Sequence, residues 1–156
     1  MIRASASAVI NAPPEEVFRF VIDPSNEPTW HTDVAEAELI SGGTFGLGRR
    51  VRYVFPFAGR RTEGSSEVVG FQQGQLVRLR FKGVPMDLDP VVTLAVEPAA
   101  GGSRFTRTVE IEPHGFKRLL APLLGGFIAK RNAGFVANLK RRLENPSSPR
   151  RAGLTG

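Results

Sequence analysis

The stretch that decides the fold is RFTRTVEIEPHGFKRLLAPLLGGFIAKRNAGFVANLKRRLE, residues 104–144. Its first part alternates apolar and polar side chains, as a strand does. The pattern then changes to apolar residues at every third or fourth position, which predicts an amphipathic helix over residues 116–144. Pro122 and the pair Gly125-Gly126 interrupt this stripe, so a kink or a loosened turn is expected there. The stretch therefore predicts a strand followed by a long C-terminal helix.

Seven segments of the chain, this one included, alternate in the way that strands do. Between the first two, the sequence APPEEVFRFVI predicts a short helix, because Pro13 and Pro14 suit a first helical turn and Glu15 favours its positive end. Antiparallel strands followed by one long helix make an α+β architecture, with the helix on one face of the sheet. The predicted strands are residues 2–11, 34–40, 49–57, the segment from 60 onward, 75–82, 88–97 and 104–112.

A tight hairpin is predicted at Ala58-Gly59, between two of these strands. If two residues form the turn, large side chains of the first strand mostly face smaller ones of the second on the inner side of the sheet. Large beside small is consistent with close packing or with unfilled volume under the helix, and an apolar ligand needs such a pocket with few polar groups. The predicted pairs are Phe57 with Arg60, Phe55 with Thr62, Tyr53 with Gly64 and Val51 with Ser66.

Length and composition favour one globular domain. The chain has 156 residues, of which 41% are hydrophobic and 23% charged, and it contains no cysteine, which excludes disulfides and Cys-ligated metals. No apolar run is long enough to cross a membrane and the N-terminus lacks the order of a secretory signal, so a cytoplasmic protein is expected. The last residues, NPSSPRRAGLTG, show no periodicity. The sequence therefore predicts a single domain over residues 1–145 and a disordered tail over 146–156.

The formal net charge of +6 permits weak attraction to phosphates or to an anionic lipid surface, but it does not identify a nucleic-acid binder. Arg50 and Arg52 point outward from the predicted sheet, where Glu63 and Glu67 can pair with them across strands. The aromatic side chains fall on the opposite face, so a platform for stacking bases is missing. No specific nucleic-acid partner and no insertion into a membrane are therefore expected.

The sequence gives little support for a metal or cofactor site. The two histidines, His31 and His114, stand in no metal-binding spacing, and the glycine-rich loop at residues 41–48 lacks the residues of a phosphate-binding motif. Asp33 is the nearest acid to His31, and two residues in a loop do not make a catalytic triad. No metal, no cofactor and no histidine base are therefore predicted.

Trp30 and Arg107 each allow two interpretations. Trp30, the chain's only tryptophan, either plugs the core or contacts a ligand. Arg107 falls on the apolar face of its strand, where an unpaired charge is costly. It either binds a carboxylate or another oxygen of a ligand, or it is neutralised by a carboxylate such as Asp87 or Asp89.

Five features occur in a set order along the chain: INAPPEEVFRFVIDPSNEPTW, the strand entry at Gly48, VVGFQQGQLVRLRF, GGSRFTRTVEIEP and LKRRLE. Taken in that order, they resemble the SRPBCC superfamily, the START-like and polyketide cyclase/dehydrase proteins, over about residues 2–144. The resemblance implies a helix-grip fold, in which a curved antiparallel sheet of six or seven strands wraps the C-terminal helix, short helices follow the first strand, and a cavity remains for an apolar ligand. Members bind lipids, sterols, quinones or polyketides, some catalyse cyclisation or dehydration, and others bind proteins.

Residues and resemblance together lead us to expect a binder of an apolar or amphipathic small molecule, of lipid, polyketide or quinone type, between the sheet and the long helix. An enzyme of the cyclase or dehydratase kind is the alternative, with Tyr53 as proton donor and Arg107 polarising a carbonyl. A module that binds a protein partner is a second alternative. The expected ligand-binding residues are Trp30, Tyr53, Phe55, Thr62, Ser66, Phe81, Arg107 and Phe127.

Overall fold

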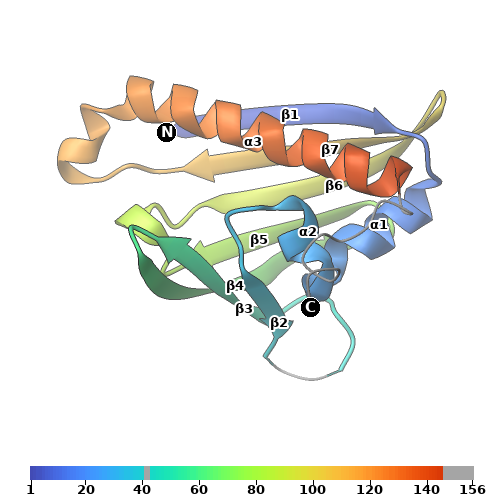
Figure 1. Cartoon of the computed structure of the whole chain (residues 1–156), viewed down its shortest axis with the longest axis horizontal. Helices are drawn as coiled ribbons and strands as arrows, with labels where there is room; N and C mark the ends of the chain where they lie inside the picture. The colour runs from blue at the N-terminus through green and yellow to red at the C-terminus, as the bar shows by residue number, and fades with distance from the viewer. Residues whose placement is uncertain (41–42, 146–156) are drawn as a thin grey trace.

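The core of the fold is one open antiparallel sheet of seven strands, in the order β1-β7-β6-β5-β4-β3-β2, in a computed structural model that describes residues 1–40 and 43–145 (Figure 1). The sheet curves around a long C-terminal helix, and short helices follow the first strand. The predicted α+β helix-grip architecture is therefore confirmed. The tail predicted over residues 146–156 lies outside the described residues, and the domain boundary at 145 stays a prediction.

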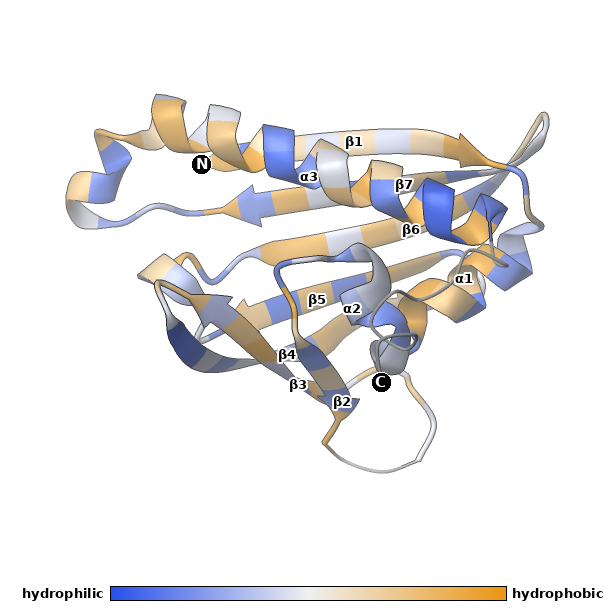
Figure 2. Ribbon diagram, in the orientation of Figure 1, coloured by the Kyte–Doolittle hydropathy of each residue, from blue (hydrophilic) through white to orange (hydrophobic). Residues whose placement is uncertain are grey.

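The observed strands agree with the predicted segments to within a few residues, and apolar and polar residues alternate along them (Figure 2). The strands are β1 (Ile2–Ile10), β2 (Glu36–Leu39), β3 (Arg50–Phe57), β4 (Arg60–Gln72), β5 (Leu76–Lys82), β6 (Val91–Ala99) and β7 (Gly102–Ile111). The helices are α1 (Pro14–Ile22), η1 (Pro24–Asn26), α2 (Glu27–Trp30), η2 (Pro85–Asp87), η3 (Gly115–Arg118) and α3 (Ala121–Glu144).

The long helix α3 begins later than its apolar stripe predicts. The segment before it forms the separate short turn η3, and Pro122 lies in the first turn of α3. Proline suits that position because its missing N–H would have no partner there anyway. Helical structure then continues through Gly125 and Gly126. The interruption predicted at Pro122 is therefore the start of the helix, and the one predicted at the two glycines is wrong.

The first and last strands of the chain are neighbours in the sheet, since β1 pairs with β7 along its whole length. The helix α3 packs mainly against β1, and α1 packs against β6 and β7. The face of α1 predicted to be apolar is buried, with Val17, Phe18 and Val21 each at most 3% exposed. Fully buried side chains from β7 and α3, such as Phe105 and Leu139, close the core between these layers.

The hairpin between β3 and β4 has the predicted register. Phe57 is paired with Arg60 and Val51 with Ser66, and Ala58 and Gly59 both have positive φ angles, as a two-residue turn requires. On the outer face, Arg52 donates hydrogen bonds to Glu38 and Glu63, so this face carries cross-strand ion pairs as expected.

No helix in the described part of the chain is long and apolar enough to cross a membrane.

Candidate functional site: an apolar cavity with a buried polar cluster

A cavity of about 380 Å³ lies between the sheet and α3. Its walls come from β3, β5, β6 and β7 on one side, from α3 on the other, and from the loop around η2 at the mouth. Most of the lining is apolar. The apolar lining residues are Phe55, Pro56, Phe57, Phe81, Val84, Pro85, Met86, Leu88, Pro90, Val92, Val109, Ile111, Phe127, Ile128 and Phe135, and the polar ones are His31, Asp33, Arg107, Arg131 and Asn132.

Half of the residues expected to bind ligand line this cavity. Phe55, Phe81, Arg107 and Phe127 belong to its wall. The other four, Trp30, Tyr53, Thr62 and Ser66, are not among the lining residues. The structure therefore brings together the aromatic side chains of three elements with Arg107, and it places the remaining candidates behind the wall or beyond it.

Trp30 packs into the core. It is 1% exposed, and its ring meets Phe105 edge to face with 6.0 Å between ring centroids. Its backbone carbonyl accepts a hydrogen bond from the side-chain amide of Asn138 in α3. Of the two interpretations left open by the sequence, the packing of Trp30 thus agrees with the core plug, which ties α2 to β7 and α3.

Tyr53 faces inward but lies behind the cavity wall. Its ring stacks on Phe55 at 5.7 Å and lies 5.1 Å from the ring of Phe81, both of which line the cavity. Its hydroxyl is 3.0 Å from the Ser66 hydroxyl, and burial raises the pKa of Tyr53 well above its ordinary value. The phenol thus keeps its proton at neutral pH and supports two aromatic residues of the wall.

Replacing Tyr53 by phenylalanine should therefore change stability and leave ligand affinity almost untouched. The variant loses one hydrogen bond to Ser66, which should lower the free energy of unfolding by about 0.5–1.5 kcal/mol. Denaturant unfolding and a ligand titration, run in parallel on both proteins, measure the two effects. A tenfold loss of affinity with unchanged stability would show instead that the Tyr53 hydroxyl reaches the ligand.

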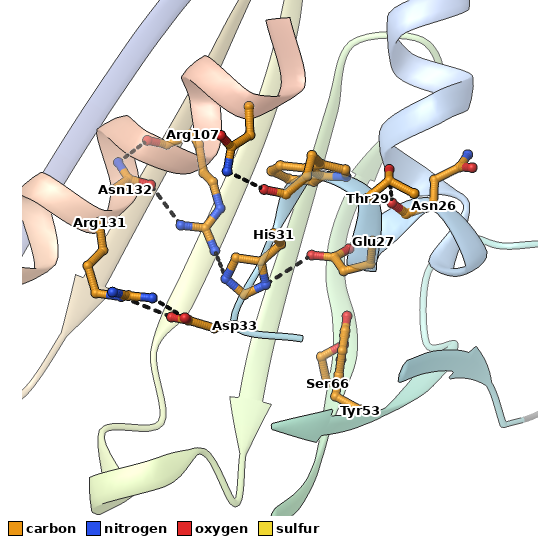
Figure 3. Close-up of polar contacts among 12 residues, drawn as sticks. Asn26, Glu27, Thr29, His31, Asp33, Tyr53, Ser66, Arg107, Arg131 and Asn132 are labelled. Carbon is orange, nitrogen blue, oxygen red and sulfur yellow. Dashed lines mark hydrogen bonds and ion pairs between the residues drawn. The ribbon is translucent and has the colours of Figure 1, made fainter. Parts of the chain in front are cut away.

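Arg107 is the charged group of the cavity's inner wall. It is 5% exposed, and its guanidinium Nη1 donates a hydrogen bond of 2.7 Å to Oδ1 of Asn132 (Figure 3). The Asn132 amide in turn donates to the Arg107 backbone carbonyl at 2.9 Å, so one α3 side chain fixes both ends of the arginine. The guanidinium carbon also lies 5.3 Å from the ring centroid of Phe135, within cation–π range.

His31 and Glu27 extend this cluster on the other side of the guanidinium (Figure 3). Nε2 of His31 is 3.5 Å from Nη2 of Arg107, and Nδ1 is 3.5 Å from Oε2 of Glu27, four residues earlier. Because an arginine can only donate, Nε2 has to be the accepting nitrogen and Nδ1 carries the proton toward Glu27. We call these four residues (Glu27, His31, Arg107 and Asn132) the buried polar cluster.

Burial sets the protonation states of the cluster. Loss of solvent lowers the pKa of Arg107 to about 10, so the guanidinium stays charged at neutral pH. The same loss of solvent raises the pKa of Glu27 to about 7, against the opposing effect of Arg107. Burial, with Arg107 and then Arg131 nearby, lowers the pKa of His31 well below its usual value. The buried polar cluster therefore holds one permanent cation and a neutral imidazole in the cavity wall, with the Glu27 carboxyl, half ionised near neutral pH, behind them.

The carboxylates suggested as partners of Arg107 lie elsewhere. Asp89 accepts a hydrogen bond from the backbone N–H of Gly83 and lies 3.9 Å from Lys82, and Asp87 is exposed in η2. The acids that act on the charge of Arg107 are Glu27 and, more weakly, Asp33. The proposed pairing with Asp87 or Asp89 is therefore wrong, because the η2 loop holds both acids at the mouth of the cavity.

Two members of the cluster, Glu27 and Asn132, were missed by the sequence analysis, although both left a signal. Glu27 and His31 stand four residues apart, the spacing at which side chains meet on a helix. Asn132 falls on the same stripe of the C-terminal helix as Ile128 and Phe135, and a polar residue on an apolar stripe needs a buried partner. The described residues hold no group of three or more His, Asp or Glu side chains placed to bind a metal.

The cluster can polarise or bind an oxygen. A buried guanidinium that keeps its charge is a strong donor to a carboxylate, a phenolate or a carbonyl oxygen. The neutral imidazole of His31 has one nitrogen beside Arg107 and the other 3.5 Å from Glu27, and its lowered pKa makes it a weak base. At the rim, Arg131 forms two hydrogen bonds to Asp33, which closes the polar side of the mouth.

Comparison with known proteins places the chain in a family. The model of the family described as polyketide cyclase / dehydrase and lipid transport matches residues 1–144. No curated protein matches the sequence. Similar solved structures include TTHA0849 from Thermus thermophilus, with 22% identity, 94% of this chain and 99% of that chain covered, and a TM-score of 0.69.

Two further solved structures share the fold. The di-domain ARO/CYC protein BexL from the BE-7585A biosynthetic pathway is 18% identical, with a TM-score of 0.77 over 96% of this chain and 48% of that one. Aha1 from Colwellia psychrerythraea is 16% identical, with a TM-score of 0.63 over 92% and 97% of the two chains. At these identities the structures show a common fold, and the family model shows descent. The chain belongs to the polyketide cyclase / dehydrase and lipid transport family.

Proposed function

We propose that this protein binds an apolar or amphipathic small molecule in the cavity, with a polar end of the ligand on Arg107. The observation that carries the proposal is a mostly apolar cavity with one buried cation in its wall. Its volume of about 380 Å³ falls in the range of small-molecule sites, roughly 300–1,000 Å³.

Among the polar residues of the wall, Arg107 is the buried group that carries a charge and can orient a ligand, with the neutral His31 beside it. Asp33 and Arg131 are bonded to each other at the partly exposed rim. Asn132 is engaged twice by Arg107. Among the described residues, Nε of Arg107 has no hydrogen-bond partner, so the guanidinium keeps unused donor capacity. Because Nε itself is buried, a ligand oxygen reaches the guanidinium through the atoms that face the cavity, and the apolar remainder of the ligand covers the aromatic wall.

The relatives support a lipid-like or polyketide-like ligand class. The family is described by polyketide cyclisation, dehydration and lipid transport, and BexL carries the description ARO/CYC. Both substrate classes combine an extended apolar body with carbonyl or carboxylate oxygens. That combination suits a cavity in which aromatic side chains surround the buried guanidinium of Arg107, with the guanidinium of Arg131 at the rim.

A second candidate is a cyclase-like reaction in the same cavity, favoured by the arrangement of His31 and Glu27. A neutral imidazole, oriented through Nδ1, has its second nitrogen next to the guanidinium that would polarise a substrate carbonyl. Incubation with a poly-β-carbonyl compound, followed by liquid chromatography and mass spectrometry against a sample without protein, separates the two functions, because retention time distinguishes an isomer of equal mass. A binder returns the compound unchanged, and a cyclase returns a product of the same mass or lighter by the mass of water.

Filling the cavity tests the proposed ligand site directly. Val109 lines the cavity from β7 and is 6% exposed, so Val109→Phe puts a larger side chain into the ligand volume. We expect affinity for a fused-ring probe, anthracene carboxylic acid, to fall about tenfold, because a filled cavity excludes part of the probe. Fluorescence titration of the probe measures the change.

The matched control is Val109→Ala, which enlarges the same cavity. It should keep the affinity for the probe within about threefold of the wild type, at a cost in stability that thermal unfolding measures. Equal affinities for all three proteins would place the ligand elsewhere on the molecule.

A further inference from the structure

The η3 turn and the beginning of α3 expose a row of large apolar side chains. Leu119 is 84% exposed, Leu123 75% and Phe127 57%, and the three stand four residues apart along the chain. Phe116 and Leu120 add to the same segment at 71% and 42%. An exposed apolar patch of this kind on a globular domain marks an interaction site more often than chance. We call these five residues the docking face.

The docking face borders the mouth of the cavity. The η3 segment projects beyond the ends of the strands, and its apolar residues continue into α3 (Figure 2). Phe127 is both part of the face and part of the cavity wall. Met86, 45% exposed, lies across the mouth in η2, and the ammonium of Lys117 in η3 donates a hydrogen bond to its backbone carbonyl. The face and the entrance to the cavity are thus one continuous surface.

The segment that carries the docking face has charges of a single sign, while the acids Asp33, Asp87 and Asp89 lie across the cavity mouth. From residue 113 to residue 143 the chain contains no aspartate and no glutamate. Arg118 and Lys130 are exposed at the two ends of the apolar row. The basic residues of this segment are Lys117, Arg118, Lys130, Arg131, Lys140, Arg141 and Arg142. A partner surface that fits this face therefore accepts apolar side chains into an apolar layer and carries negative charge around it.

We propose that the docking face binds peripherally to the surface of an anionic lipid bilayer. Exposed leucine and phenylalanine side chains flanked by lysine and arginine are the composition of an interfacial membrane contact. The apolar row enters the boundary between headgroups and acyl chains, and the flanking cations pair with anionic headgroups. The cavity mouth then faces the membrane.

A second copy of the chain fits this face less well. A symmetric contact between two such faces brings like charges together, because every charged side chain from 113 to 143 is basic. The proposal goes beyond ligand binding and does not depend on it, since Leu119 and Leu123 do not line the cavity.

Vesicle co-sedimentation tests the proposal with two kinds of vesicle, one of neutral phosphatidylcholine and one that also contains phosphatidylglycerol. We expect the full-length protein to bind the anionic vesicles and to lose binding as salt is added. The double variant Leu119→Ser/Leu123→Ser should bind on the order of tenfold more weakly. Arg118→Gln/Lys130→Gln should reduce binding to anionic vesicles by about fivefold for each charge removed.

The matched controls lie on other surfaces. Leu47→Ser removes an equally exposed leucine, 69% exposed, from the loop before β3, and Arg19→Gln/Arg60→Gln removes two exposed cations elsewhere. Both should leave vesicle binding unchanged, and all variants should keep their affinity for anthracene carboxylic acid. The proposal would be overturned if the wild-type protein did not co-sediment with anionic vesicles at low salt. A stable dimer, seen by analytical ultracentrifugation, that only Leu119→Ser/Leu123→Ser dissociates would also overturn it.

Discussion

Replacing Arg107 by methionine should weaken the binding of anthracene carboxylic acid on the order of 100-fold. A hydrogen bond to a charged group contributes about 1.5–3 kcal/mol, and tenfold in affinity corresponds to about 1.4 kcal/mol. The hydroxymethyl analogue of the probe has the same shape but no charge, so its affinity should change far less. Parallel titrations of both probes isolate the charge of Arg107 from its volume.

Asn132→Asp tests the same site with an almost unchanged shape. The new carboxylate would lie where Oδ1 of Asn132 now accepts from Arg107, at 2.7 Å, and would neutralise the guanidinium from within the protein. We expect the affinity of this variant for the anionic probe to fall as it does in Arg107→Met. Its affinity for the neutral probe should stay close to that of the wild type. Thermal unfolding serves as the control, because removing the guanidinium leaves Asn132 without its hydrogen-bond donor and Glu27 without a nearby cation, and this lowers stability. If both variants bind the two probes as the wild type does, Arg107 has a purely structural role.

Replacing Glu27 by glutamine should stabilise the protein in a manner that depends on pH. Burial raises the pKa of Glu27 from 4.5 to about 7, so between these values the folded protein keeps a proton that the unfolded chain releases. The wild type therefore loses stability as pH rises through this window. A shift of this size corresponds to about 3 kcal/mol, and glutamine, which cannot ionise, avoids that loss. The variant should match the wild type near pH 4 and exceed it by about 3 kcal/mol near pH 8.

The lowered pKa of His31 changes stability with pH in the opposite direction to the raised pKa of Glu27. The effect of Glu27 is therefore measured as the difference in unfolding free energy between the wild type and Glu27→Gln at each pH. The lowered pKa of His31 means that below its ordinary value of 6.5 the unfolded chain takes up a proton that the folded protein refuses. This effect reduces stability as pH falls, and it is common to the wild type and Glu27→Gln. Denaturant unfolding across the pH range gives the difference. Glu16→Gln, at an exposed position of α1, is the control, and a difference for Glu27→Gln that stays flat with pH contradicts the buried carboxyl.

Much of the fold could be predicted because each element depends on local patterns. The alternation in the strands, the prolines at the start of α1 and the two-residue turn at Ala58-Gly59 each identify a local structure, and the register of the β3–β4 hairpin follows from that turn alone. The start of α3 was harder to predict. The apolar residues before Ala121 have helical spacing, but they belong to an exposed turn, and spacing alone does not distinguish a buried stripe from an exposed one.

The candidate site could be predicted only in part, because it depends on contacts between distant segments. The inward direction of Arg107 follows from the alternation of its strand. Its partners do not, since Asn132 lies 25 residues away and His31 76 residues away in sequence. The alternation of side chains along a strand also placed Tyr53 and Ser66 on the inner face correctly. It does not say which inward-facing residues border open volume. That distinction depends on how far α3 and the η2 loop stand off the sheet.

The pairing of β1 with β7 has a consequence for how the protein is made. Among the described residues, β1 has β7 as its one neighbour in the sheet, and its apolar side packs under α3, which is synthesised later still. During translation the segment Ile2–Ile10 therefore stays unpaired until nearly all of the described chain has emerged. Unpaired strands of this kind are prone to aggregate, and contacts between distant segments form slowly. Folding on the ribosome would thus end in one late closing step, in which β1 joins β7 and α3.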